Sequence, residues 1–459
     1  MKLQKHSSRS SRFEMDMTTG ALLHKVLMFS LPLVLTSILQ LLYNAADVIV
    51  VGRFAGPQSL AAVSSTGALI NLLVNIFMGL SVGSSVVIAR AYGAGDVREV
   101  QQSVHTSITV AGIAGVGVGI LGFFASRPML QLMNSPENVI DLAALYMRIF
   151  FLGMPFNMLY NFGAAILRAV GDTRRPLYFL TASGLVNVLL NLLLVIVFRL
   201  DVAGVAIATV VSQLISAVLV LGCLLRSEGS IRLDPRSLRI HREPLIHIVR
   251  VGLPAGLQGS LFSISNVLIQ SSVNSFGSIA MAGNGAAANL EGFVYVAMNA
   301  IHQAALTFAS QNLGARKLDR VRRNMWVCLA TVTVIGLSMG LVMLLLGRPL
   351  LFLYNDDPEV IRYGLLRMAF ILPTYFTCGC MDVIVGQLRG IGYSIMPMIV
   401  SLTGACLFRV VWIYTAFAAS PTLNTLYISY PISWVLTFAV HLACYLYVSG
   451  HRLKHVAQA

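Results

Sequence analysis

Long apolar stretches separated by short polar breaks run through the whole chain. Stretches of about 18 or more residues with almost no charge are typical of helices that cross a lipid bilayer. The breaks between them carry Gly, Pro or charged residues, which favour turns. We therefore predict an all-α polytopic membrane protein with twelve transmembrane helices. They lie at residues 24–52, 58–90, 97–125, 137–169, 174–199, 202–226, 244–275, 279–312, 318–346, 358–390, 394–418 and 423–449.

The second half of the chain repeats landmarks of the first half at a nearly constant spacing. Six helices per repeat is an even number, so both halves enter the membrane from the same side. They are then expected to be related by a pseudo-twofold axis along the membrane normal. We predict an N-terminal lobe at residues 1–226, a basic cytoplasmic linker at 227–243 and a C-terminal lobe at 244–459. The paired landmarks are Pro32 with Pro254, Gly93 with Gly314, Pro136 with Pro358, Gly171 with Gly392, and Pro176 with Pro397.

Charge narrows the class of protein and sets its orientation. Of the 459 residues, 57% are apolar and 11% are charged, which is too little charge to cover the surface of a soluble protein. The excess of 32 Lys and Arg over 18 Asp and Glu is better explained by basic cytoplasmic loops than by nucleic-acid binding. Most basic residues become cytoplasmic if both termini are cytoplasmic. Those nearest the termini include Lys2, Lys5, Arg9, Arg12 and Lys454.

Several classes of site are missing from the sequence. The six cysteines lie inside apolar segments and show neither disulfide nor zinc spacing. Residues 1–19 are polar and basic without a cleavable signal pattern, so the first apolar segment should remain as a spanning helix. No nucleotide-binding loop, nucleophile elbow or zinc-protease motif is present. We expect no enzyme activity, no cofactor and no structural metal.

One carboxylate stands out in the first predicted helix. Gln40, Tyr43 and Asp47 are spaced three and four residues apart, so they share one face. An ionisable group inside a membrane is costly and normally has a function. A desolvated carboxylate there could carry a proton or bind Na⁺, whereas the alternative is a solvated Asp47 at the mouth without a role.

Uncharged polar residues recur along three further helices of the first half. Amide and hydroxyl oxygens are the ligands that Na⁺ would need beside one carboxylate. The alternative is that they only hydrogen-bond neighbouring helices together. We favour their convergence on Asp47 as a cation-coupling site. Its predicted members are Tyr43, Asp47, Asn157, Asn161, Asn187, Asn191 and Thr209.

The second half holds its own intramembrane polar residues. Glu291 and Arg409 are expected at a similar depth, and buried charges normally come in pairs. They are therefore either a structural ion pair or part of a binding surface for cationic substrates. The predicted substrate-binding residues are Gln40, Gln258, Glu291, Tyr295, Met298, Asp382 and Arg409.

Four segments resemble motifs of the multidrug and toxic compound extrusion (MATE) transporters. Residues 42–53 (LYNAADVIVVGR) are similar to the first-helix signature of that family. Residues 167–172 (LRAVGD) and 388–392 (LRGIG) resemble its paired Leu-Arg-x-x-Gly elements, and residues 311–315 (QNLGA) resemble the exit of its eighth helix. The resemblance covers roughly residues 20–450, with two lobes of six helices.

The resemblance implies a secondary pump that exports cationic, amphipathic compounds in exchange for Na⁺ or H⁺. In the family the first-helix acid binds the coupling cation, which here is Asp47. Polar groups of the fourth, fifth and sixth helices map to Asn161, Asn187, Asn191 and Thr209. Some members carry a second aspartate where this chain has Asn191.

We accordingly expect a cell-membrane multidrug antiporter that works by alternating access as a monomer. Its partners would be small-molecule drugs or toxic metabolites and the lipid bilayer, with no nucleic acid. The nearest alternative is a lipid-linked precursor flippase of the same superfamily, which usually has more helices and a basic cavity. A channel would need a continuous polar pore, and a membrane enzyme would need a catalytic constellation.

Overall fold

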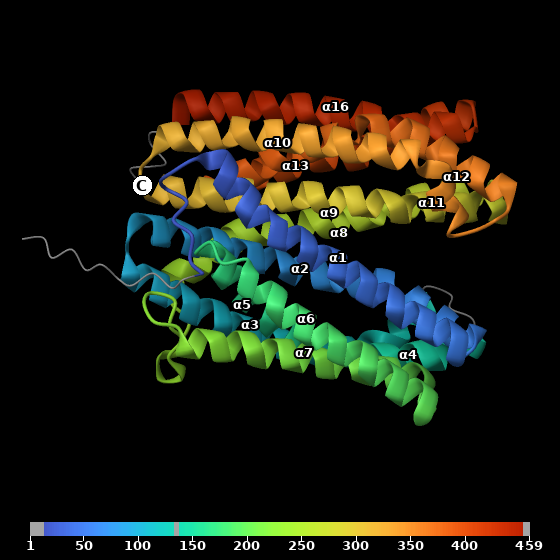
Figure 1. The fold of residues 1–459 in the computed structure, drawn as a ribbon, viewed down its shortest axis with the longest axis horizontal. Coiled ribbons are helices and arrows are strands. Elements are labelled where there is room, and N and C mark those ends of the chain that lie inside the picture. The colour runs from blue at the N-terminus through green and yellow to red at the C-terminus, as the bar shows by residue number, and fades with distance from the viewer. Residues whose placement is uncertain (1–12, 133–136, 453–459) are drawn as a thin grey trace, which may run out of the picture. The chain divides into compact units, whose positions relative to one another are not determined.

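The computed structural model describes residues 13–132 and 137–452, and within these ranges every regular element is a helix (Figure 1). The all-α prediction is confirmed. The predicted basic residues Lys2, Lys5, Arg9, Arg12 and Lys454 lie outside the described residues, as does the landmark Pro136.

The first half of the chain forms a series of long helices. Helix α2 begins with a proline directly after Gly56, whose φ of 87° suits glycine. Helix α2 ends at Ala94, and Gly95 caps it in the left-handed conformation. The elements are α1 (Leu22–Phe54), α2 (Pro57–Ala94), α3 (Val97–Leu132), α4 (Glu137–Leu152), α5 (Met154–Ala169), α6 (Arg174–Asn191), the π-helical turn η1 (Leu192–Val197) and α7 (Asp201–Arg226).

The second half repeats this order with more breaks. Asp357 caps α12, because its side chain accepts a hydrogen bond from the Glu359 N–H. Among its elements η2 and η3 are 3₁₀ turns, whereas η4, η5 and η6 are π-helical. The elements are η2 (Pro235–Ser237), α8 (Arg242–Asn274), α9 (Ser278–Gly314), α10 (Leu318–Leu345), α11 (Gly347–Phe352), α12 (Pro358–Ile371), η3 (Leu372–Thr374), α13 (Tyr375–Gly390), α14 (Ile395–Ser401), η4 (Leu402–Leu407), α15 (Phe408–Trp412), η5 (Ile413–Phe417), α16 (Leu423–Tyr447) and η6 (Val448–Arg452).

Most of these helices have the length and composition of membrane spans. Within the described residues, ten helical segments are long and apolar enough to cross a membrane, or eleven if α4 and α5 count as one span bent by 48°. The 37-residue α9 is not among them, although its length suffices, because it carries polar residues such as Asn284, Glu291 and His302. The chain is therefore a multi-span membrane protein, with a helical segment at each of the twelve predicted positions.

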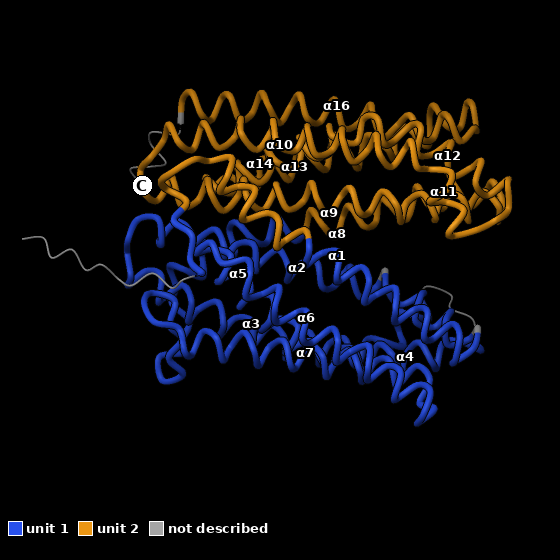
Figure 2. The backbone as a smooth tube through the Cα atoms, in the orientation of Figure 1, with its two compact units in different colours: residues 1–16, 35–256 blue, residues 17–34, 257–459 orange. Residues whose placement is uncertain are grey.

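The helices group into two compact units (Figure 2). Unit 1 comprises residues up to Asp16 and Leu35–Gly256, and unit 2 comprises Met17–Val34 and Leu257–Ala459. The first part of α1 therefore packs in unit 2, and the first part of α8 packs in unit 1. The functional division into lobes at residues 227–243 stays a prediction.

Close helix packing in unit 1 depends on glycine. A Cβ at Gly79 of α2 would meet the backbone of Gly256 on α8. A Cβ at Gly252 of α8 would lie 2.6 Å from the Cα of Leu80 on α2. Small residues at such crossings let two helix backbones approach closely within a membrane. The first part of α8 is thereby held against α2.

The basic segment between α7 and α8 is docked on α3. The backbone N–H of Asp234 donates to Nε2 of His105 at 3.1 Å. The Asp234 side chain caps η2, and the hydrogen bonds it accepts from the Arg236 N–H and the Ser237 hydroxyl hold the pKa of this carboxyl below its usual range. The segment thus has a defined path in unit 1.

Candidate functional site

The carboxylate of Asp47 meets the end of α6 in unit 1. Nδ2 of Asn191 donates a hydrogen bond to Oδ1 of Asp47 and another to Oδ1 of Asn187, the latter at 3.3 Å. Asn191 is completely buried and Asn187 nearly so, whereas Asp47 is half-buried. Oδ1 of Asn191 is buried and receives no hydrogen bond from the described residues. The carboxylate and two amide oxygens therefore lie close together, and one of the amide oxygens has no hydrogen-bond partner among the described residues.

Tyr43 fixes α1 against the same face of α6. Its hydroxyl donates to the carbonyl oxygen of Thr181 at 3.4 Å, and its ring lies directly over Gly184, where a Cβ would overlap the ring. The side chain one turn before Asp47 thus sets the distance between the two helices.

Three other predicted members make their hydrogen bonds inside their own helices. Nδ2 of Asn161 donates to the carbonyl oxygen and to Oδ1 of Asn157, at 2.8 and 3.0 Å. The hydroxyl of Thr209 donates to the carbonyl oxygen of Val205 at 3.0 Å. The structure therefore joins Asp47, Asn187 and Asn191, with Tyr43 beside them, and gives no hydrogen bond from Asn157, Asn161 or Thr209 to Asp47 among the described residues. Their place in the site stays a prediction.

One neighbour of Asp47, Tyr146, was not predicted from the sequence. Tyr146 of α4 is almost fully buried and close enough to Asp47 to interact with its charge. Its helix reads as an ordinary apolar span, so no spacing singles Tyr146 out. Gln40, by contrast, is exposed at the start of the Asp47 face.

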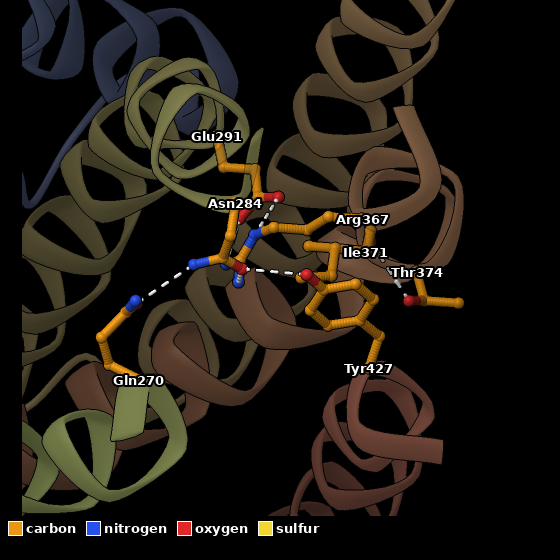
Figure 3. Close-up of polar contacts among 7 residues, drawn as sticks. All are labelled: Gln270, Asn284, Glu291, Arg367, Ile371, Thr374 and Tyr427. Atoms are coloured by element: carbon orange, nitrogen blue, oxygen red, sulfur yellow. Dashed lines mark hydrogen bonds and ion pairs between the residues drawn. The ribbon is translucent and has the colours of Figure 1, made fainter. Parts of the chain in front are cut away.

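In unit 2, Glu291 of α9 pairs with Arg367 of α12 rather than with Arg409 (Figure 3). Nε and Nη2 of Arg367 donate to the two carboxylate oxygens at 2.9 and 2.7 Å. Both side chains are buried. Of the two alternatives for Glu291 and Arg409, the structural ion pair is therefore wrong, because Arg367 engages both carboxylate oxygens of Glu291.

The ion pair sits in a larger polar network. Oδ1 of Asn284 accepts from Nη1 of Arg367 at 2.8 Å and from the hydroxyl of Tyr427 at 3.1 Å (Figure 3). Nδ2 of Asn284 donates to Oε1 of Gln270 at 3.1 Å. A buried charge pair surrounded by satisfied hydrogen bonds is typical of a structural element.

The remaining predicted residues of unit 2 lie around α13. Nη2 of Arg389 donates to Oε1 of Gln258 at 2.8 Å. Nδ1 of His302 lies 2.6 Å from the backbone carbonyl oxygen of Asp382. Asp382 itself is half-buried and interacts electrostatically with Arg389.

Met298 and Tyr295, the other two predicted substrate-binding residues of unit 2, differ in their exposure to solvent. Met298 is completely buried, with its sulfur 2.7 Å from the place that a Cβ on Gly379 would take, while Tyr295 keeps 39% of its surface exposed. Met298 therefore packs in the core of the bundle. No cluster of three or more His, Cys, Asp or Glu residues that could hold a metal occurs within residues 13–132 and 137–452.

Arg409 of α15 is buried and has no carboxylate partner in the part of the chain that the structure describes. Its Nε donates to the Ser433 hydroxyl at 3.0 Å, and its guanidinium lies over the rings of Tyr430 and Trp434 at 4.3 and 5.6 Å. None of the ion pairs among the described residues includes it.

Comparison with known proteins gives one consistent family. A model of the MatE family matches residues 32–193 and again residues 254–415, so the same pattern occurs once in each half of the chain. The chain is 30% identical to the probable multidrug resistance protein YoeA of Bacillus subtilis, with 82% of each chain covered. It is 27% identical to the FAD transporter of Shewanella oneidensis, covering 74% of this chain and 75% of the relative.

A solved structure supports the fold. A multidrug resistance MATE family transporter of the MOP superfamily, in an outward-facing conformation, superimposes with a TM-score of 0.86 at 22% identity. The superposition covers 96% of this chain and 98% of that one. The twelve-helix, two-bundle fold class is confirmed. By the doubled family match and by its relatives, the chain belongs to the MATE family of multidrug transporters.

Proposed function

We propose that this transporter exports amphipathic organic cations and takes up Na⁺ or H⁺ in exchange, with Asp47 as the coupling carboxylate. The exchange proceeds by alternating access in the plasma membrane, with both termini in the cytoplasm and one chain as the working unit. One named relative, YoeA, is a probable multidrug resistance protein, which supports the export of drugs.

The observation that carries the proposal is the grouping of Asp47, Asn187 and Asn191. A carboxylate held by an amide donor away from bulk water exchanges a proton or a small cation more readily than it stays charged and unpaired. Carboxylate and amide oxygens are also the ligands that a hard cation prefers. The free Oδ1 of Asn191 supplies such an oxygen beside Asp47.

Coupling at this site links the ion to helix movement. Asp47 lies on α1, whereas Asn187 and Asn191 lie on α6. Neutralising the carboxylate, by a proton or by Na⁺, weakens its charge-assisted hydrogen bond to Asn191. The contact between α1 and α6 therefore differs between the loaded and empty states, which is the differential interaction that antiport needs.

The test is ethidium efflux from vesicles with Na⁺ and H⁺ gradients imposed one at a time. The unaltered protein should respond to one gradient, and Asp47→Asn should abolish that response at an unchanged protein level. Asp141→Asn, an exposed carboxylate paired with Arg127, is the matched control and should transport normally.

Two results would contradict the proposal. Transport that ignores both gradients would rule out antiport. Normal gradient-driven efflux by Asp47→Asn would move the coupling site elsewhere while leaving antiport in place.

A further inference from the structure

Arg409 carries a buried positive charge that unit 2 does not neutralise. Only 4% of the residue is exposed, and its Nη2 is buried with no hydrogen-bond acceptor among the described residues. Glu291, the other buried charge expected near it, is fully engaged by Arg367. Buried charges normally have an opposite charge or a full set of hydrogen bonds, so this guanidinium edge needs an explanation.

Aromatic rings line the guanidinium on its faces. Tyr430 and Trp434 make cation–π contacts with Arg409, and Tyr375 lies 5.3 Å from Trp434 between ring centroids. Such faces attract a cation but offer no acceptor to the N–H groups at its edge. The site therefore combines an aromatic wall with a free, directional donor.

The internal repeat shows what this position corresponds to in unit 1. The two family matches have equal lengths, so we pair position 32 with position 254 and position 193 with position 415. In this pairing Val51 of α1 corresponds to Val273 of α8, and both are completely buried. Asp47 then corresponds to Ile269, which is 2% exposed, whereas the neighbouring Leu268 is 39% exposed. Burial therefore places Ile269 on the inward face that Asp47 occupies in the first half.

Asn191, the hydrogen-bond partner of Asp47, also has an apolar counterpart in the second half. In the same pairing Asn191 corresponds to Ile413, and Ile413 packs against the apolar cluster that contains Ile269. A hydrogen bond between Asp47 and Asn191 in one half is thus matched by an apolar contact in the other.

Asn187 alone has a charged counterpart. The two family matches end at positions 193 and 415, and the landmarks Pro176 and Pro397 lie shortly before these ends. The spacing between the two landmarks is one residue shorter than the spacing between the two ends. The second half therefore has one extra residue between Pro397 and position 415. The π-helical turn η4 lies there, and a π turn accommodates an extra residue in a helix. Beyond it Asn187 corresponds to Arg409, and both side chains are buried.

The site equivalent to Asp47 therefore has the opposite charge in unit 2. We infer that Arg409 binds an oxyanion, a carboxylate or a phosphate, attached to an aromatic solute that packs on the neighbouring rings. This inference rests on the proposed transport function and assigns Arg409 as the subsite for the acidic group of an aromatic solute. Unit 1 would hold the coupling cation and unit 2 the acidic group of the solute.

The test is equilibrium binding to the purified full-length protein, measured by calorimetry without any ion gradient. Norfloxacin and its methyl ester form the carboxylate pair, 1-naphthyl phosphate and 1-naphthol form the phosphate pair, and ethidium is the cation. The unaltered protein should prefer at least one anionic member over its neutral or esterified match. Arg409→Gln should weaken that member about tenfold or more and change ethidium less than twofold.

Two further variants keep the result interpretable. Arg362→Gln removes an exposed arginine of the same unit and should leave all five ligands unaffected. Arg409→Lys keeps the charge but loses the planar fork, and should weaken the anion selectively even if Arg409→Gln does not fold.

Two outcomes would overturn the inference: no preference for either anion in the unaltered protein, or an equal loss of anion and ethidium in Arg409→Lys. Because no gradient is used, neither outcome depends on whether antiport itself is found.

Discussion

At the scale of single residues, the amide and carboxylate side chains differ in whether they hydrogen-bond to another helix or within their own helix. Asn191 bonds a carboxylate on another helix, whereas Asn161 bonds a residue of its own helix. Glu291 is satisfied twice by one arginine. A side chain that bonds across helices has more influence on the fold and on function than one that bonds within its helix.

The amide at Asp47 gives the first prediction. Asn191→Ala removes a hydrogen bond to a charged group, a contribution of about 1.5–3 kcal/mol, so gradient-driven efflux should fall about tenfold or more. Asn274→Ala is the control, because Asn274 is exposed and its side chain accepts a hydrogen bond from Gln270 of its own helix. Initial efflux rates at matched protein levels measure both. Equal loss in the two variants would mean that Asn191 has no special role.

The buried ion pair gives a stability prediction. Glu291→Gln leaves the Arg367 guanidinium buried and unpaired, and should destabilise the protein by about 3–5 kcal/mol. Adding Arg367→Met should recover most of the loss. Glu359→Gln, in a pair whose side chains are 54% and 66% exposed, should cost less than about 1 kcal/mol. Thermal unfolding in detergent measures the stability of all three variants. An unchanged melting temperature for Glu291→Gln would contradict the structural role of the ion pair.

At the scale of elements, helix contacts position the Asp47 face. Tyr43 of α1 packs over Gly184 of α6, and η1 begins directly after Asn191. The α-helical hydrogen-bond pattern changes at the residue that holds the carboxylate. π turns are frequent at functional positions.

The contact between α1 and α6 can be tested with one methyl group. Gly184→Ala overlaps the Tyr43 ring, so the ring must leave, its hydroxyl bond to Thr181 is lost and efflux should fall. Gly112→Ala has open space and should keep activity, with a stability gain of up to about 1 kcal/mol from helix propensity. Efflux and melting temperature are measured together. Full activity of Gly184→Ala would show that this contact does not position Asp47.

At the scale of the whole molecule, the topology is a prediction: with an even number of spans, we expect both ends of the chain and the segment between α7 and α8 on one side of the membrane. From the basic bias of that segment we expect this side to be the cytoplasm. Ser237 in the segment and Ser420 before α16 are both exposed, so they can report on the two sides.

The topology prediction uses thiol labelling of intact cells. Ser237→Cys should react with a membrane-impermeant maleimide only after permeabilisation, whereas Ser420→Cys should react in intact cells. The parent chain, with its six native cysteines, gives the background. The reverse pattern would place the termini outside.

Much of the fold follows from local pattern. Apolar length predicts the spans, and the repeated landmarks predict the duplication that the family match confirms. Spacing also places Asp47 and Tyr43 on one face of α1, and the structure puts both against α6. These features depend on helical periodicity and on the hydrophobic effect. Both leave a pattern of apolar and polar residues along the chain.

The choice of partners depends on tertiary structure alone. Arg367 looks like one of many arginines in the sequence, yet it neutralises Glu291 from a helix 76 residues away. Among the residues that the structure describes, Arg409 is consequently left with aromatic neighbours and a donor that has no acceptor. The sequence by itself determined which helices exist and which polar residues lie inside them. Only the fold decided which charges meet, because electrostatic pairing acts between helix faces whose neighbours no periodicity specifies.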